Sequence, residues 1–172
     1  MKAYDKSANE EIFRKNVLEL LKGAKKEIIV VTGEFYVFEQ FQDLRWGIKE
    51  AIERGTKVKV IAKSPSTIMI NKLLNWGAEV YQTSEIPKEH FVLFDENAVM
   101  TTREHEAYTI KGVREGSILN YREDSAKIKE YVAKTEDLLK KAKKITKITP
   151  EDDPLIKLIK NPIKIEAELN IE

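Results

Sequence analysis

The sequence of 172 residues contains no cysteine and only two histidines, His90 and His105. Without cysteine there is neither a disulfide framework nor a thiolate zinc site, and two histidines do not suggest a histidine-rich metal centre. We therefore expect no metal and no cofactor. No apolar stretch reaches the roughly 18 residues of a membrane span, and the first residues lack the apolar segment of a signal peptide. These absences lead us to expect a cytoplasmic protein that makes no use of a membrane.

An excess of charge of one sign is also absent. The chain has 30 basic and 29 acidic side chains, which gives a net charge of +1. The molecule as a whole has no field that attracts nucleic acid or an anionic membrane, although a local basic patch remains open. Charged residues make up 34% and apolar residues 42% of the chain, which indicates a globular protein with a core. A composition rich in lysine, glutamate and isoleucine is typical of thermophilic proteins.

Helical and strand patterns alternate in the first half of the chain. Strands that alternate with helices indicate a parallel sheet with right-handed crossovers. In chain order, the apolar patterns predict a helix after the capping-box pattern Ser7-x-x-Glu10, a strand at 27–32, a helix at 37–54, a strand at 57–62, a short helix ending near Trp76 and capped by Gly77, and a strand at 78–81.

After residue 81 the pattern changes to short strand candidates with no helix between them, which favours a meander added to the sheet. These candidates and a following long helix are expected at 90–95, 97–102, 106–111, 116–121 and 123–146. We expect residues 1–147 to form one domain and 148–172 to form a C-terminal extension. Apolar and polar residues alternate strictly at 163–171, which predicts a terminal strand that pairs with a sheet edge of this molecule or of a second copy.

The segment Lys88-Glu89-His90-Phe91-Val92-Leu93-Phe94-Asp95 combines two basic residues, an apolar strand and an aspartate. Residues two apart on a strand point to the same face, so Lys88 and His90 are expected to lie side by side. Phe91 and Leu93 are expected to share the opposite face and to pack away from that pair. The spacing therefore predicts two cationic side chains at the start of a strand and a carboxylate at its end.

The Lys88-x-His90-x4-Asp95 spacing resembles the H-x-K-x4-D motif of the phospholipase D family, with the histidine and the lysine exchanged. The order of elements over about residues 10–147 also resembles a half-domain of that family. The resemblance implies an α/β sandwich with a mixed sheet flanked by helices. It also implies a homodimer, because single-motif members pair two half-domains across the motif. In active members the histidine attacks a phosphodiester to form a phosphohistidine, and a second copy of the motif supplies the acid.

This sequence departs from the family motif at three places. Lys88 stands at the position of the nucleophile, and a lysine is an ammonium ion at neutral pH unless it is strongly desolvated. His90 lies about 6–7 Å further along the strand, and a misplacement of even ~1 Å can cost on the order of a hundredfold in rate. Thr101-Thr102 stand near the position of the family's Gly-Ser pair. We therefore expect no catalytic residue and no phosphodiesterase activity.

The exchanged motif can retain the recognition of an anion. Lys88, His90 and the Thr102 hydroxyl form a candidate site for a phosphate, sulfate or carboxylate, with Asp95 orienting one of the cations. Tyr36 follows the first parallel strand, at the edge where open α/β sheets bind ligands, and is a candidate lining residue. The alternative is that Lys88 is a solvated loop residue, that His90 opens a core strand and that Tyr36 belongs to the core or its rim.

The resemblance extends to the sensor domain of archaeal TrmB-type transcription regulators, in which a phospholipase D-like domain with eroded catalytic residues serves for sensing and dimerisation. It implies a non-catalytic module for regulation, anion sensing or dimerisation, associated with transcription or nucleic acid. Those regulators carry a winged-helix DNA reader in front, for which this chain begins too close to its first core helix. Two alternatives remain open: a residual phosphodiesterase or nuclease, and a non-enzymatic nucleic-acid-binding protein.

Overall fold

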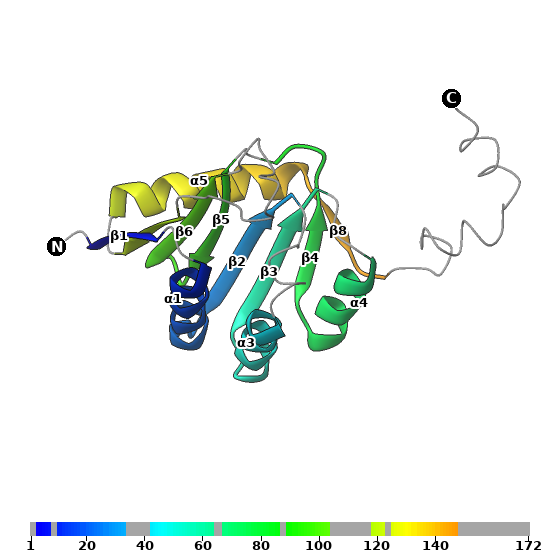
Figure 1. Cartoon of the computed structure of the whole chain (residues 1–172). Helices are drawn as coiled ribbons and strands as arrows, with labels where there is room; N and C mark the ends of the chain where they lie inside the picture. Colours follow the sequence, from blue (N-terminus) through cyan, green and yellow to red (C-terminus); the bar gives the residue numbers. More distant parts are fainter. Residues whose placement is uncertain are drawn as a thin grey trace, which may run out of the picture.

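The computed structural model describes residues 3–7, 10–33, 42–63, 67–86, 89–103, 118–122 and 125–147. In this part of the chain an eight-stranded mixed sheet has helices on both faces, so the predicted α/β fold is confirmed (Figure 1). Several predicted features lie outside the described residues: Tyr36, Lys88, His105, the strand at 106–111 and the extension at 148–172.

The centre of the sheet is parallel, as the alternation of helices and strands predicts. Each central strand is preceded along the chain by a helix, and the strand-to-strand registers Glu27↔Lys57 and Lys59↔Glu79 align the three strands. The elements are α1 (Glu10–Gly23), β2 (Glu27–Thr32), α3 (Gln42–Glu53), β3 (Lys57–Ala62), α4 (Thr67–Trp76) and β4 (Glu79–Gln82).

Antiparallel strands extend this centre on both sides. The meander predicted after residue 81 is confirmed for the strands that the structure describes, and the sheet order is β1-β7-β6-β5-β2-β3-β4-β8. The added strands are β1 (Ala3–Ser7), β5 (Glu89–Phe94), β6 (Ala98–Arg103), β7 (Ile118–Arg122) and β8 (Lys143–Ile145).

Two edge strands correct the predicted boundaries. Ser7, predicted to begin a capping box, is the last residue of β1 and lies opposite Ile118 of β7, and α1 begins at Glu10. The long helix α5 (Ser125–Lys141) is shorter than the predicted 123–146, because the chain after it turns to pair with β4 as β8. In both places a strand that the local pattern does not reveal is formed by pairing with a distant part of the chain.

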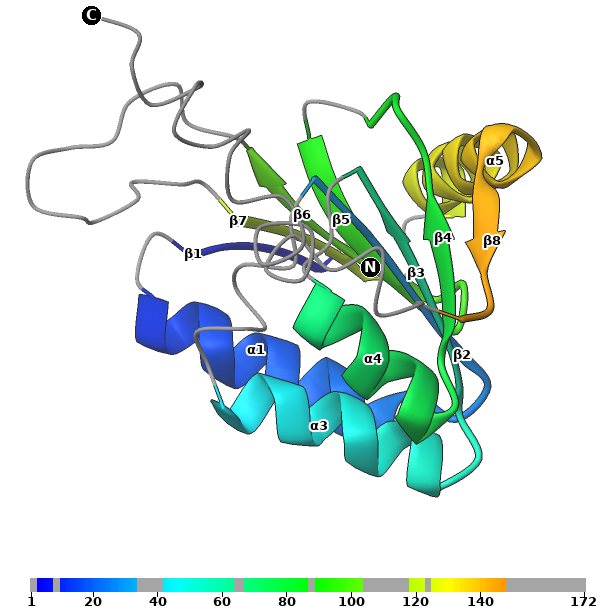
Figure 2. The ribbon, with the colours of Figure 1, turned by 90° about the vertical axis from the view of Figure 1, so that its right-hand side faces the viewer.

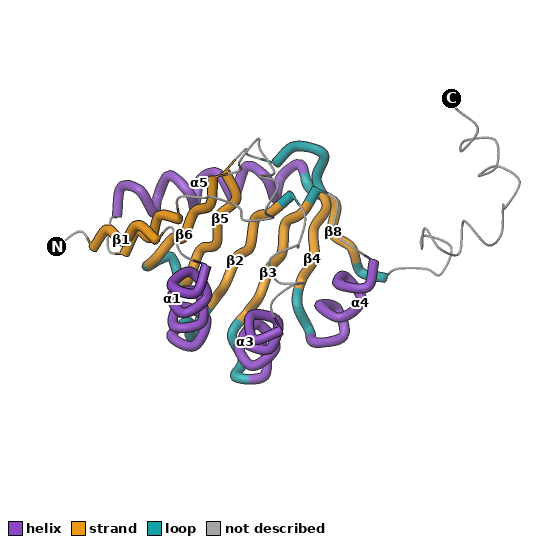
Figure 3. Tube along the Cα trace, viewed as in Figure 1, coloured by secondary structure: helices purple, strands orange, loops and turns teal. Residues whose placement is uncertain are grey.

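The core has two layers, one on each face of the sheet. Figure 2 shows α1, α3 and α4 packed against one face and α5 against the other, and Figure 3 shows the strands as one continuous layer between them. Alternate residues of the strands supply each layer. On the α1 side the helices contribute Val17, Leu21, Ile48, Ala51, Met69 and Leu73, and on the α5 side Ile128, Tyr131 and Leu138.

The helix ends follow ordinary capping chemistry. Gly77 has a φ of 102°, and its N–H and that of Ala78 donate to the Leu73 carbonyl at 3.1 and 2.9 Å. This is the glycine-terminated helix end predicted for α4. Among the described helices, none combines the length and the apolar character needed to cross a membrane.

Candidate anion-binding site

His90 lies at the carboxyl edge of the parallel strands. Strand β5 runs antiparallel to β2 with Val31 opposite Phe91, so the start of β5 meets the end of β2. Phe91 and Leu93 are buried on the α5 face, whereas Val92 and Phe94 belong to the layer formed with α1, α3 and α4. The prediction that Phe91 and Leu93 pack away from the side of His90 is confirmed, and the alternation places His90 on the α1 face.

The imidazole of His90 contacts the backbone immediately after β2. The Gly33 N–H donates to His90 Nε2 at 3.3 Å, and His90 is partly buried. In this arrangement Nε2 is an acceptor, so the neutral imidazole carries its proton on Nδ1. A Cβ built on Gly33 would lie 3.4 Å from Nε2, which is van der Waals contact with the ring.

Backbone hydrogen bonds between neighbouring segments continue beyond the ends of the strands at this edge. The Lys63 N–H donates to the Gly33 carbonyl at 3.2 Å, and the Thr83 N–H donates to the Ala62 carbonyl at 3.0 Å. The amino ends of α3 and α4 lie towards the same edge (Figure 2), where the helix dipoles favour negative charge. This edge therefore combines backbone hydrogen bonds between neighbouring strand ends with the amino ends of two helices.

The structure brings one other predicted site residue into register with His90. Thr102 of β6 is the cross-strand partner of His90, and paired residues in an antiparallel sheet lie on the same face. Only the backbone of Thr102 is described. Lys88 and Tyr36 lie outside the described residues, so their places in the site remain predictions.

Asp95 lies at the other end of β5, about 16 Å from His90 for five residues of strand. Its carboxylate accepts hydrogen bonds from the backbone N–H groups of Lys25, Lys26 and Glu27 at 2.7, 2.7 and 2.8 Å. The sequence led us to expect that Asp95 orients one of the cations, Lys88 or His90, but its carboxylate does not orient His90. It fixes the turn between α1 and β2 instead.

The chemistry of Asp95 fits this structural role. Partial burial works to raise the pKa of the carboxyl, but the three backbone N–H groups and the nearby Lys26 charge lower the pKa below its usual value. Asp95 and Glu96 have φ values of 52° and 55°, and Asn97 donates its N–H to the Phe94 carbonyl at 2.9 Å. Aspartate is one of the residues that tolerate a left-handed turn conformation, which suits Asp95 to the turn after β5.

The comparisons with known proteins agree with this topology. No family model and no curated protein matches the sequence. Among solved structures, Nuc of Salmonella typhimurium, a phospholipase D family member, superposes with a TM-score of 0.68 at 15% identity, over 86% of this chain and 100% of its own. This chain has a phospholipase D-like fold. NucT from Helicobacter pylori superposes with a TM-score of 0.65 at 13% identity, over 83% of this chain and 98% of its own.

A third similar structure is TrmBL2, described as an archaeal chromatin protein with a novel mode of DNA binding. It superposes on this phospholipase D-like chain with a TM-score of 0.62 at 16% identity, over 83% of this chain. The match covers 53% of TrmBL2, so the present chain spans about half of that protein. These low identities establish the fold and leave the chemistry to the residues of this chain.

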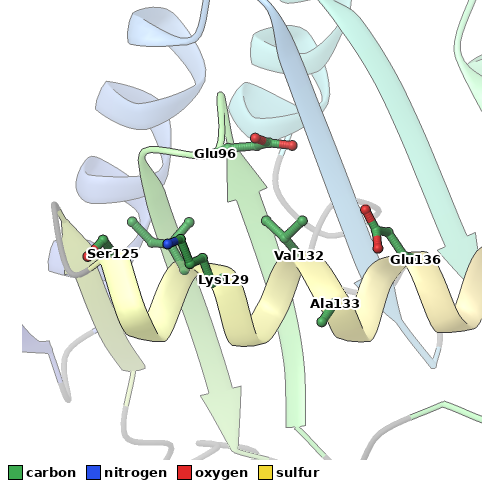
Figure 4. Close-up of a pocket in the computed structure, with 7 residues that line it drawn as sticks. Glu96, Ser125, Lys129, Val132, Ala133 and Glu136 are labelled. Atoms are coloured by element: carbon green, nitrogen blue, oxygen red, sulfur yellow. The ribbon is translucent and has the colours of Figure 1, made fainter.

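Two grooves lined by described residues do not include His90. One groove of about 320 Å³ runs between α5 and the β5–β6 turn, where Lys129, Val132 and Glu136 face Glu96 (Figure 4). A second, of about 260 Å³, lies beside Asp95 at the end of α1. Among the residues that the structure describes, no group of three histidine or acidic side chains is placed to hold a metal ion.

Proposed function

We propose that this chain is a phospholipase D-like module that recognises an anionic group at the carboxyl edge of its sheet and does not cleave phosphodiesters. The observation that carries this proposal is the hydrogen bond from the Gly33 N–H to His90 Nε2. It makes His90 Nε2 an acceptor just after the end of β2, in a motif where Lys88 stands at the nucleophile position.

The inability to cleave follows from what a nucleophile requires. An imidazole attacks phosphorus with the lone pair of a neutral nitrogen, and the lone pair of His90 Nε2 is already an acceptor for Gly33. Lys88 has no lone pair available while it is an ammonium ion. Neither residue of the exchanged pair is therefore suited to form a covalent phosphoryl intermediate.

Binding of an anion requires hydrogen-bond donors and positive charge but no nucleophile. A cationic Lys88, the His90 ring and the Thr102 hydroxyl together supply donors of the kind that bind phosphate, sulfate or carboxylate. The register between His90 and Thr102 and the amino ends of α3 and α4 support this arrangement. In a homodimer joined across this edge, a bound anion would lie near both copies and link ligand binding to assembly, as regulation requires.

The test follows the two histidine side chains during addition of inorganic phosphate, by NMR of the imidazole groups. We expect the His90 resonances to shift with saturation and those of His105 to change much less. His90→Ala should abolish saturable binding, whereas His105→Ala should leave it intact. Equal and unsaturated shifts of both histidines would exclude the anion site.

The absence of cleavage is measured separately, with bis(p-nitrophenyl) phosphate at high protein concentration. We expect no turnover by the natural sequence. Hydrolysis that His90→Ala removes would overturn the proposal in favour of a residual phosphodiesterase. The double variant Lys88→His/His90→Lys restores the family order, so hydrolysis by this variant alone would trace the missing activity to the exchange.

A further inference from the structure

The charge of this nearly neutral molecule is concentrated in one part of the fold. Residues 125–147, which form α5 and β8, contain eight lysines and three acidic residues. This part therefore carries a net charge of +5, while the whole chain carries +1, so the remainder of the chain is negative. A basic face on an otherwise neutral or acidic protein is the usual electrostatic footprint of a polyanion site.

Five of these lysines are exposed at the end of α5 and in or just after β8, the strand at one edge of the sheet (Figure 1). Neighbouring strand residues alternate, so Lys143 and Lys144 point to opposite faces of this edge strand. Ion pairs join two of the five to carboxylates: Lys141 lies 3.4 Å from Glu85, and Lys144 lies 3.8 Å from Glu79. No carboxylate of the described residues is within ion-pair distance of the others. The α5–β8 lysine surface consists of Lys140, Lys141, Lys143, Lys144 and Lys147.

Structural roles account for part of this surface only. Lys140 and Lys141 lie in the last turn of α5, where cations stabilise the helix dipole. Lysine on an edge strand also discourages pairing with other chains, and Lys143 and Lys144 occupy two of the three positions of β8. Each role is met by one or two lysines, and bringing five together costs repulsion that an anionic partner would relieve.

We propose that the α5–β8 lysine surface binds the phosphate backbone of double-stranded nucleic acid without reading its sequence. Residues 140–147 comprise only lysine, alanine, isoleucine and threonine. They lack the arginine, asparagine and glutamine side chains that pair with base edges in the major groove. Contacts made by lysine alone position a protein on the backbone and carry no sequence information.

The surroundings favour a duplex over a single strand or a membrane. Single-strand binding uses exposed rings as stacking platforms. The nearby Tyr81 is partly buried, and its hydroxyl donates to Glu79 at 2.6 Å. Membrane association needs exposed apolar side chains beside the lysines, but the large exposed ones among the described residues, Trp46 and Ile68, lie on α3 and α4, which cover the face of the sheet opposite α5.

This surface is separate from the His90 site. Strand β8 is four strands away from β5 in the sheet, about 19 Å at the usual spacing between strands. Nucleic-acid binding here therefore goes beyond the proposed anion recognition at His90, and each can fail without the other. His90→Ala should leave duplex binding unchanged.

The test measures binding of a labelled duplex of about 30 base pairs and mixed sequence, by fluorescence anisotropy between about 50 and 200 mM salt. In the surface variant, Lys140, Lys141, Lys143 and Lys144 are all replaced by glutamine. A matched control replaces the exposed Lys15, Lys22, Lys25 and Lys26, so that both variants lose four positive charges. Glutamine retains good helix propensity, and circular dichroism checks folding.

We expect the natural chain to bind with an affinity that falls steeply with salt. The surface variant should bind more than tenfold more weakly at low salt, and its salt slope should be smaller by about 0.9 for each phosphate that the variant no longer neutralises. The control should change little. An equal weakening in the two variants, no binding at the lowest salt, or binding to phosphatidylserine vesicles in place of the duplex would each overturn the proposal.

Discussion

A single carboxylate at the end of β5 fixes a turn that lies about seventy residues earlier in the chain. Asp95 accepts three backbone hydrogen bonds from residues 25–27. From the other side, Arg54 donates to the Leu21 carbonyl at 2.8 Å and Thr56 donates to the Ala24 carbonyl at 3.1 Å. The turn between α1 and β2 is thus held by the β5–β6 turn and by the α3–β3 turn, and β2 leads directly to Gly33, which contacts His90.

We expect Asp95→Asn to destabilise the fold by about 1–2 kcal/mol at pH 7. Hydrogen bonds from N–H groups to a charged acceptor are worth more than neutral ones, and partial exposure to solvent reduces the effect. Urea denaturation followed by tryptophan fluorescence measures the change. Glu96→Gln, at the exposed neighbouring position with a similar φ, is the control and should change the free energy of unfolding much less.

The same substitution should alter the response to acid. The pKa of Asp95 is lower in the folded protein than in the unfolded chain, where a carboxyl of this type titrates near pH ~4. Its stabilising contribution is therefore complete above that value and is lost as the pH falls through the lower, folded pKa. The stability difference between the natural chain and Asp95→Asn should shrink on acidification. A difference that is constant with pH would assign the effect of the substitution to packing.

Thr101 presents the opposite case, a buried polar group without a partner. Its side chain is fully buried, and its hydroxyl has no hydrogen-bond partner among the described residues. Burial of an unpaired hydroxyl costs roughly 1–3 kcal/mol, and valine has a similar shape and favours strands. We therefore expect Thr101→Val to stabilise the protein by about 1 kcal/mol.

Thr56→Val is the matched comparison for that substitution. Thr56 is also buried, but its hydroxyl donates to the Ala24 carbonyl at 3.1 Å, so its removal should destabilise by about 1–2 kcal/mol. Thermal and urea unfolding of both variants show whether each substitution raises or lowers the free energy of unfolding. If Thr101→Val also destabilises, the hydroxyl is satisfied in solution, for example by a bound water.

At the scale of elements, the local sequence pattern determines some helices and strands, and pairing with distant parts of the chain determines others. The strands β2 and β3 were predicted with the bounds that are observed, because β2 is mainly a continuous apolar run and β3 alternates lysine with valine before an apolar end. The end of α4 was predicted because Gly77 adopts a positive φ that few other residues tolerate. In these places the sequence neighbours of a residue decide its conformation.

The edge strands were missed for a physical reason. Ile145 continues the helical spacing of Leu138 and Ala142, so periodicity alone extends α5 past its real end. The helix stops because β4 would otherwise leave an open edge, which Lys143–Ile145 covers while Ile145 packs on the core. Strand β1 likewise exists only through its pairing with β7, more than one hundred residues away. Such pairings leave no local trace in a short, polar segment.

At the scale of the whole molecule, the motif spacing predicted the position of His90 on its strand but gave Asp95 the wrong role. It predicted His90 at the start of a strand, because alternation along a strand is a local property, and it grouped His90 with Thr102, which is its cross-strand partner in the structure. It could not show that Asp95 meets the turn after α1, because that contact depends on how β5 lies beside β2. The Gly33 contact with His90 depends on the same pairing.

The same edge carries the prediction about assembly. A site built by two copies requires the carboxyl edges of two sheets to face each other, so we expect a dimer joined there, with a mass of twice 19.9 kDa by light scattering.

Because the chain has no cysteine, a single introduced cysteine reports on one place only. Lys63→Cys puts a thiol at the carboxyl edge just past β3, and Lys26→Cys puts one at the opposite edge beside the Asp95 turn; both positions are exposed. Mild oxidation of the dilute protein should cross-link Lys63→Cys rapidly and Lys26→Cys slowly, because only the first thiol has its counterpart close by. A monomeric mass, or faster cross-linking through position 26, would show that the two His90 edges do not meet, and any anion bound there would then be held by one copy alone.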